Sequence, residues 1–261
     1  MGHERVGFLP KTKRWTHLVG QIEAAYASDT PVSSVAAQTL QNVRTRYENL
    51  SRDDAVRASF TFLVAFARAC RFPNPQTELQ RSEIRMPDQP TVLSIVRAIR
   101  DFVPAHDANS EYGQLALAAA ADAIGQWHKQ HATGQMPLLE PTGDFYSSWR
   151  ELSRGAGFCE LARHYFGKLT ERYLNYFLDR AASSTCPDIQ HRDRFQKQIH
   201  AHIDEVSKHA FETAKITQSF AAGWFTAHTR DQMPDTKEIE GFLSVAFGKL
   251  RDELRREQEA K

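Results

Sequence analysis

Apolar and polar residues alternate along most of the chain with the three- and four-residue spacing of amphipathic helices. The richest apolar stripe lies in residues 158–177 and consists of Phe158, Leu161, Tyr165, Phe166, Leu169, Tyr173, Tyr176 and Phe177. Such a stripe is too apolar to face water, so this helix packs against the protein's own core or against a partner. We interpret it first as the central packing element of the C-terminal half, with a partner role for any part that its neighbours leave exposed.

The same spacing predicts further helices over residues 12–27, 35–47, 56–67, 91–103, 110–131, 188–228 and 235–250. Ser51 to Asp54 resembles a capping box that opens the helix after it. The proline-rich residues 72–90 are typical of a loop with one short helical turn, and the charged residues 251–261 of a solvated or frayed end. No segment favours a strand. The predicted fold is therefore all-α, with bundle-like packing of about eight to ten helices and no significant sheet.

The clearest interruption of this pattern contains Gly134, Pro137, Pro141 and Gly143. It divides the chain into an N-terminal helical half (residues 1–132), a connector (residues 133–144) and a C-terminal helical half (residues 145–261). The same segment is also compatible with an internal loop of a single domain.

Composition sets limits on the class of protein. Of the 261 residues, 41% are hydrophobic and 25% charged, which is typical of a chain with a packed core. The formal net charge of +1 argues against a protein that coats nucleic acid. Three widely separated cysteines favour reduced thiols in the cytoplasm. No apolar run reaches the roughly 20 residues that cross a bilayer, so we expect no membrane span.

Motifs that would indicate catalysis are missing from the sequence. It contains no Walker A loop, no Gly-x-Gly-x-x-Gly and no Gly-x-Ser-x-Gly nucleophile elbow. We therefore expect no catalytic residues and no cofactor. An enzyme of unfamiliar helical type remains a third and disfavoured class, because the members of a catalytic site can lie far apart in the sequence.

One histidine- and glutamate-rich stripe has the residue types of a metal site. It consists of His202, Glu205, His209 and Glu212. At about 100° per residue these side chains flank the apolar centre of their helix instead of lying within it. Glu160 and His164, which might complete such a site, lie opposite the aromatic stripe of their own helix. We therefore expect no metal, and a solvated flank with pairs such as Glu205 and His209.

The favoured function is a non-catalytic adaptor or assembly subunit that binds other protein subunits, including a second copy of itself. Aromatic residues carry much of the energy of protein interfaces, and they are dense between residues 145 and 177. The candidate contact residues are Phe8, Trp149, Phe158, Tyr165, Tyr173 and Tyr176. The Ala- and Arg-rich composition suggests a bacterial multiprotein system, with phage defence as an example.

The alternative function is association with nucleic acid. Cations beside an indole ring can hold phosphates and stack on a base. The N-terminal segment offers this combination in Lys11, Lys13, Arg14 and Trp15. The competing interpretation of the same residues is a solvated helix start whose Trp15 packs inward.

Overall fold

The computed structural model describes residues 13–27, 32–131, 145–185, 189–211 and 219–259. These ranges form helices and no strand, which confirms the all-α prediction. The elements are α1 (Lys13–Ala27), α2 (Val32–Asn42), α3 (Arg44–Asn49), η1 (Leu50–Arg52), α4 (Asp54–Ala69), α5 (Pro75–Arg81), α6 (Val92–Phe102), α7 (Ala105–Ala108), α8 (Glu111–His131), η2 (Phe145–Ser153), α9 (Gly155–Thr185), α10 (Ile189–Phe211), α11 (Phe220–His228) and α12 (Thr236–Glu259). They outnumber the helices expected because short elements such as α3 and α7 add to the long ones. None of the described helices is long and apolar enough to span a bilayer.

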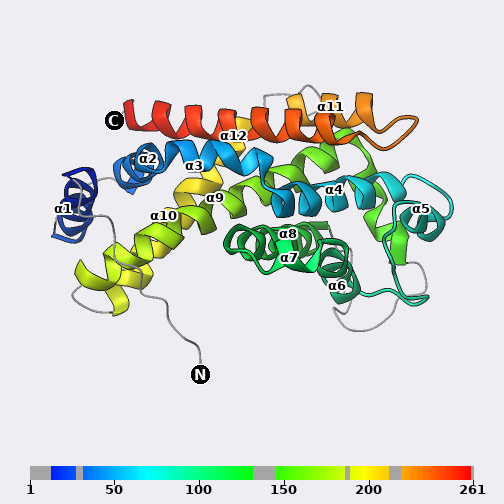
Figure 1. Ribbon diagram of the computed structural model, residues 1–261, viewed down its shortest axis with the longest axis horizontal. Helices are drawn as coiled ribbons and strands as arrows, with labels where there is room; N and C mark the ends of the chain where they lie inside the picture. Colours follow the sequence, from blue (N-terminus) through cyan, green and yellow to red (C-terminus); the bar gives the residue numbers. More distant parts are fainter. Residues whose placement is uncertain (1–12, 28–31, 132–144, 186–188, 212–218, 260–261) are drawn as a thin grey trace.

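Helix α9 is the central element of the fold. It runs diagonally through the molecule beneath α12, and helices from both ends of the chain pack on it (Figure 1). Its stripe residues Phe158, Leu161, Tyr165, Leu169 and Tyr173 are fully buried. Burying one such side chain stabilises a fold by about 1.5–3 kcal/mol. The interpretation of this stripe as a packing element is therefore confirmed.

The two predicted halves share one hydrophobic core. Helix α8 of the first half packs along α9 of the second. The hydroxyl groups of Tyr47 and Thr170 lie 2.7 Å apart in the buried interior. The connector over residues 133–144 lies outside the described residues, and the division into halves remains a prediction.

Local sequence signals set several helix starts. The Thr91 side chain accepts from the Ser94 backbone, and the Ser94 hydroxyl accepts from the Thr91 backbone, which is a complete capping box for α6. The capping box expected at Ser51 is wrong, because Ser51 lies within η1. Asp53 is the cap of α4 and accepts hydrogen bonds from the backbone N–H groups of Ala55 and Val56.

The single long helix expected over residues 188–228 is also wrong. The chain forms α10 and α11 there, and residues 212–218 between them are outside the described part. Ser219 has the extended backbone of an N-cap (φ −63°, ψ 151°), and its hydroxyl accepts from the Ala222 N–H. Because the backbone leaves the helical region at Ser219, α11 is a separate helix.

The C-terminal helix extends further than its charge pattern predicts. Helix α12 continues to Glu259, and both Glu253 and Leu254 are buried. A frayed end is therefore wrong for residues 251–259, whereas the expected solvation holds for Asp252, Arg255 and Arg256, which are exposed. One apolar position and one shielded carboxylate keep these last turns packed on α2 and α10.

Candidate functional site

Most aromatic residues expected to bind a partner lie in the core. Trp149, Phe158, Tyr165 and Tyr173 are each 0% exposed, so their assignment as a contact surface is wrong for the folded chain. The rings of Phe158 and Phe225 stack at 4.2 Å, which shows how closely neighbouring helices cover this face. Among the remaining candidates, Tyr176 is partly buried against the core. Phe8 lies outside the described residues.

The N-terminal cationic segment does not present its indole ring to solvent. Trp15 is 7% exposed and packs on Phe177, with ring centroids 5.7 Å apart. It is therefore unable to stack on a base, which corrects its assignment as a nucleic-acid contact. Lys13 is exposed. Lys11 and the Arg14 side chain lie outside what the structure describes.

The polar face of α9 is buried. Arg163 and His164 are only 4% and 5% exposed, because α8 and α10 cover them. Arg163 donates to the Asp204 carboxylate of α10 at 3.0 Å. His164 Nε2 lies 2.9 Å from Gln130 Oε1 and 3.7 Å from the Glu160 carboxylate. This face therefore forms a polar seam between three helices.

Burial controls the protonation of the seam. It lowers the pKa of His164, and the nearby Arg163 charge lowers it further, against the opposing effect of Glu160. Burial alone would raise the pKa of Glu160, but His164, His131 and Arg163 outweigh it and lower that pKa. A hollow beside the seam, lined by described residues, holds about 10 Å³, enough for about one water. The described seam is a packing element and offers no room for a substrate.

The histidine stripe on α10 forms the expected solvated flank only in part. His202 is buried, Glu205 and His209 are exposed, and Glu212 lies outside the described residues. His209 faces the carboxylates of Glu253 and Glu257 on α12, so the expected pairing with Glu205 is wrong. The ligating atoms of His209, Glu253 and Glu257 all lie within 4.8 Å of one another.

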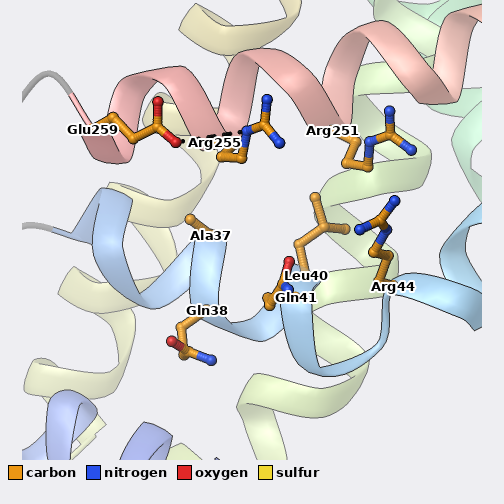
Figure 2. A pocket seen from close by; sticks show the side chains of 8 residues that line it. All are labelled: Ala37, Gln38, Leu40, Gln41, Arg44, Arg251, Arg255 and Glu259. Carbon is orange, nitrogen blue, oxygen red and sulfur yellow. Dashed lines mark ion pairs between the residues drawn. The ribbon is translucent and has the colours of Figure 1, made fainter.

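An arginine-lined groove lies between α2 and the C-terminal turns of α12. Figure 2 shows Arg251, Arg255 and Glu259 on α12, across a gap from the lining residues of α2 and α3. The hollow has a volume of about 260 Å³ and is lined by Ala37, Gln38, Leu40, Gln41, Arg44, Arg251, Arg255 and Glu259.

The arginines of this groove are paired with carboxylates of the same chain. Glu48 accepts from Arg44 at 2.9 Å and from Arg251 at 2.5 Å, and both hydrogen bonds lower the Glu48 pKa. Arg251 also donates to Asp252 at 2.7 Å. Arg255 has the longest of these pairs, with Nε 3.7 Å from Glu259 Oε1. These pairs clamp α3 to α12, so the groove carries little free positive charge for a ligand.

Two hollows larger than this groove adjoin beside α6. One of about 570 Å³ lies among α4, α6, α7 and the start of α12. A second of about 970 Å³ lies between α6 and the segment after α5. Both are lined by Glu83, Asp101 and Phe102, so they adjoin. We call the combined hollow the acidic cleft; its ionisable lining residues are Asp54, Arg57, Glu83, Arg85, Asp101 and Asp107.

The carboxylates at the junction of the two hollows are exposed and available. Glu83 and Asp101 form no ion pair with another described residue. Arg57, by contrast, pairs with Asp54 and also with Glu240 at 2.8 Å. Arg85 lines the same hollow and also forms no ion pair with a described residue, but the lining holds four carboxylates against two arginines. The acidic cleft therefore presents net negative charge next to the partly buried ring of Phe102.

Glu83 reaches this position through an unusual backbone. The Ile84 N–H bonds to the Leu79 carbonyl at 2.9 Å, and the Glu83 N–H to the Gln80 carbonyl at 3.0 Å. This pattern is a Schellman motif that ends α5, with Glu83 where glycine is usual. Its φ of 61° makes it the one non-glycine residue with positive φ in the described chain. A strained residue at the junction of two hollows supports a functional role for the cleft.

The sequence held no usable signal for this cleft. Its carboxylates come from α4, α6, α7 and the segment after α5, and no two share a motif spacing. Asp54 and Asp101 each lie on the ordinary polar face of an amphipathic helix. Only the packing of these elements brings the charges together.

Comparison with known proteins adds no relative to this picture: no family model, curated protein or solved structure matches the chain.

Proposed function

We propose that this chain is a non-catalytic helical adaptor or assembly subunit that binds a cationic segment of a partner protein in the acidic cleft. The observation that carries the proposal is the pair of unengaged carboxylates, Glu83 and Asp101, where the two large hollows adjoin. A bacterial multiprotein system is the setting proposed for such a subunit.

The chemistry of the cleft favours lysine or arginine side chains as ligands. Its carboxylates can accept charge-assisted hydrogen bonds, and Phe102 offers an apolar surface for an aliphatic stem. Negative charge in a cleft also accelerates the encounter with a positive partner. Phosphate groups would be repelled, so the cleft favours a protein segment over nucleic acid.

The size of the cleft supports the same ligand class. Together the two hollows exceed the roughly 300–1,000 Å³ of a typical small-molecule site. An extended peptide segment with two or three cationic side chains suits such an open, elongated shape. The aromatic stripe of α9 plays a different part, because Phe158 packs in the core against Phe60 of α4 and Phe242 of α12, two helices that also line the cleft.

The proposal is tested by purifying the tagged protein from its native host with and without nuclease. The wild-type chain should recover a partner protein that resists nuclease and dissociates at high salt. The double variant Glu83→Lys and Asp101→Lys should lower that recovery by at least about tenfold, because like charges then face the cationic segment. Melting temperature checks that both proteins are folded.

A matched control changes the same charge elsewhere. Asp193 and Glu205 are exposed on α10, away from the cleft, so Asp193→Lys with Glu205→Lys alters net charge equally. This control should retain the partner. Equal losses in both double variants, failure of the wild-type chain to recover any partner, or a complex that nuclease abolishes would each contradict the proposal.

A further inference from the structure

Three metal-ligating side chains converge where α10 meets the last turns of α12. His209 comes from α10, and Glu253 and Glu257 lie one turn apart on α12. His209 Nδ1 lies 3.7 Å from Glu253 Oε1 and 3.6 Å from Glu257 Oε1. The imidazole nitrogen is thus nearly equidistant from two carboxylate oxygens on a neighbouring helix.

Histidine–carboxylate contacts in the described fold range from 2.8 Å for His200 and Glu171 to 3.9 Å for His228 and Glu238. His209 is set apart because it lies near two carboxylates at once, and its two distances are of the longer kind. Both exceed hydrogen-bond length. Elsewhere in the same fold, His200 Nδ1 approaches Glu171 Oε2 to 2.8 Å and forms a hydrogen bond. His209, Glu253 and Glu257 therefore surround a common point and do not form hydrogen bonds with one another.

Glu253 gives this arrangement its second distinguishing feature. Its side chain is only 9% exposed, and a carboxylate shielded to this degree needs positive charge beside it. Arg256 pairs with Oε2 at 2.9 Å, while Oε1 is turned to His209. No hydrogen bond to Glu253 Oε1 occurs among the described residues. A shielded, ionisable oxygen directed at two other ligand atoms is characteristic of a cation site.

We propose that His209, Glu253 and Glu257 bind a divalent transition-metal ion, with zinc as the best match. Zinc takes histidine nitrogen and carboxylate oxygen at about 2.0–2.2 Å, which separates neighbouring tetrahedral ligand atoms by about 3.3–3.5 Å. The distances from His209 need to shrink by only a few tenths of an ångström to fit. Two carboxylates offset the ion's charge, and a fourth position remains for water.

The ion would join α10 to the C-terminal turns of α12. This end of α12 is distant in sequence from its first turns, where Thr236 and Ile239 line the acidic cleft. The experiments on the metal site and on the proposed partner site therefore test different residues, and their outcomes are independent. In the sequence, His209 is separated from Glu253 and Glu257 by more than forty positions. The helical stripe of His202, Glu205, His209 and Glu212 therefore gave no indication of the two side chains that would bind the ion with His209.

The test uses metal-free full-length protein without a histidine tag. Zinc titration followed by calorimetry should give one ion per chain, and elemental analysis after gel filtration should find the same ratio. At zinc about 100-fold above the dissociation constant, the melting temperature should rise by roughly 5–10 °C.

Variants locate the ion. His209→Gln and Glu257→Gln change partly exposed residues and should preserve the fold. Each should lower zinc affinity by at least about 100-fold, because mutation of a residue that only orients a metal ligand already lowers metal affinity by about 10–100-fold. Glu205→Gln on α10 and His106→Gln on α7, which is 99% exposed, should bind as the wild type does. Absence of stoichiometric zinc in the wild-type protein, or unchanged affinity in His209→Gln, would overturn the assignment.

Discussion

The Tyr165 hydroxyl lies 2.8 Å from Ser59 Oγ and 3.2 Å from the Val56 carbonyl, in the fully buried contact between α9 and α4. The two hydroxyl-bearing residues are 106 positions apart in the chain. This bond fixes the register of α9 on α4, and α4 in turn forms one wall of the acidic cleft. The core contact of Tyr165 and the proposed binding site therefore share helix α4.

Truncation of this side chain should therefore be costly. We expect Tyr165→Ala to lower the free energy of unfolding by about 3–5 kcal/mol, because it leaves a cavity among aromatic rings. Tyr165→Phe keeps the ring and loses only the hydroxyl, so it should cost about 1 kcal/mol. Urea unfolding measures both. A loss below about 1 kcal/mol for Tyr165→Ala would show that the site is not part of the core.

Two glycines of α8 should respond in opposite ways to alanine. A Cβ at Gly113 would lie 1.9 Å from the Asp107 carbonyl oxygen, so the backbone would have to move. Gly113→Ala should therefore cost at least about 1–3 kcal/mol. Gly125, in the same helix, has nothing within 4 Å, and Gly125→Ala should stabilise by about 0.5–1 kcal/mol. Thermal unfolding of the pair tests the geometry, and equal effects would contradict it.

The buried seam should make stability depend on pH through His164. Burial lowers its pKa in the folded chain, whereas the unfolded chain takes up the proton near the ordinary value of about 6.5. The unfolded state then binds more protons below that pH. The contribution of His164 to stability is therefore complete above about pH 6.5 and is lost as the pH falls from there towards the lowered pKa of the folded chain.

The measurement compares unfolding free energies between pH 7 and pH 5. The wild-type protein should lose stability across this window, and His164→Gln should show a shallower decline. The lowered pKa values of Glu160 and Asp204 act at more acidic pH, below about 4.5, so they do not obscure the effect. His106→Gln, at an exposed site, should keep the wild-type slope. A slope unchanged in His164→Gln would refute this explanation.

The strained backbone at Glu83 predicts that glycine at this position stabilises the fold, although it removes a carboxylate from the acidic cleft. Its φ of 61° suits glycine better than a residue with a Cβ. We expect Glu83→Gly to raise the free energy of unfolding by up to about 1 kcal/mol, while partner recovery falls. Glu83→Gln retains the strain and should leave stability within about 0.5 kcal/mol of the wild type. Destabilisation by Glu83→Gly would mean that the side chain itself holds the turn.

Local sequence patterns were sufficient for much of the fold. The apolar spacing of residues 158–177 predicted α9 and its packing role, because one buried stripe leaves a periodic trace in the sequence. The cap at Thr91 likewise depends on neighbouring residues. The same reasoning failed at Ser219, where a new cap begins α11 inside a continuous apolar pattern. Periodicity shows which face of a helix is buried. It does not reveal the end of one helix and the start of the next when the apolar spacing continues unchanged across the break.

What the sequence alone determined is therefore the all-α class, most helix positions and the aromatic core. The tertiary structure decided which polar groups meet. It buried Arg163 and His164 under α8 and α10, placed His209 opposite Glu253 and Glu257, and joined Glu83 to Asp101 in the acidic cleft. The physical reason is range: helix formation and amphipathicity depend on residues a few positions apart, whereas each of these groupings depends on how separate segments of the chain pack.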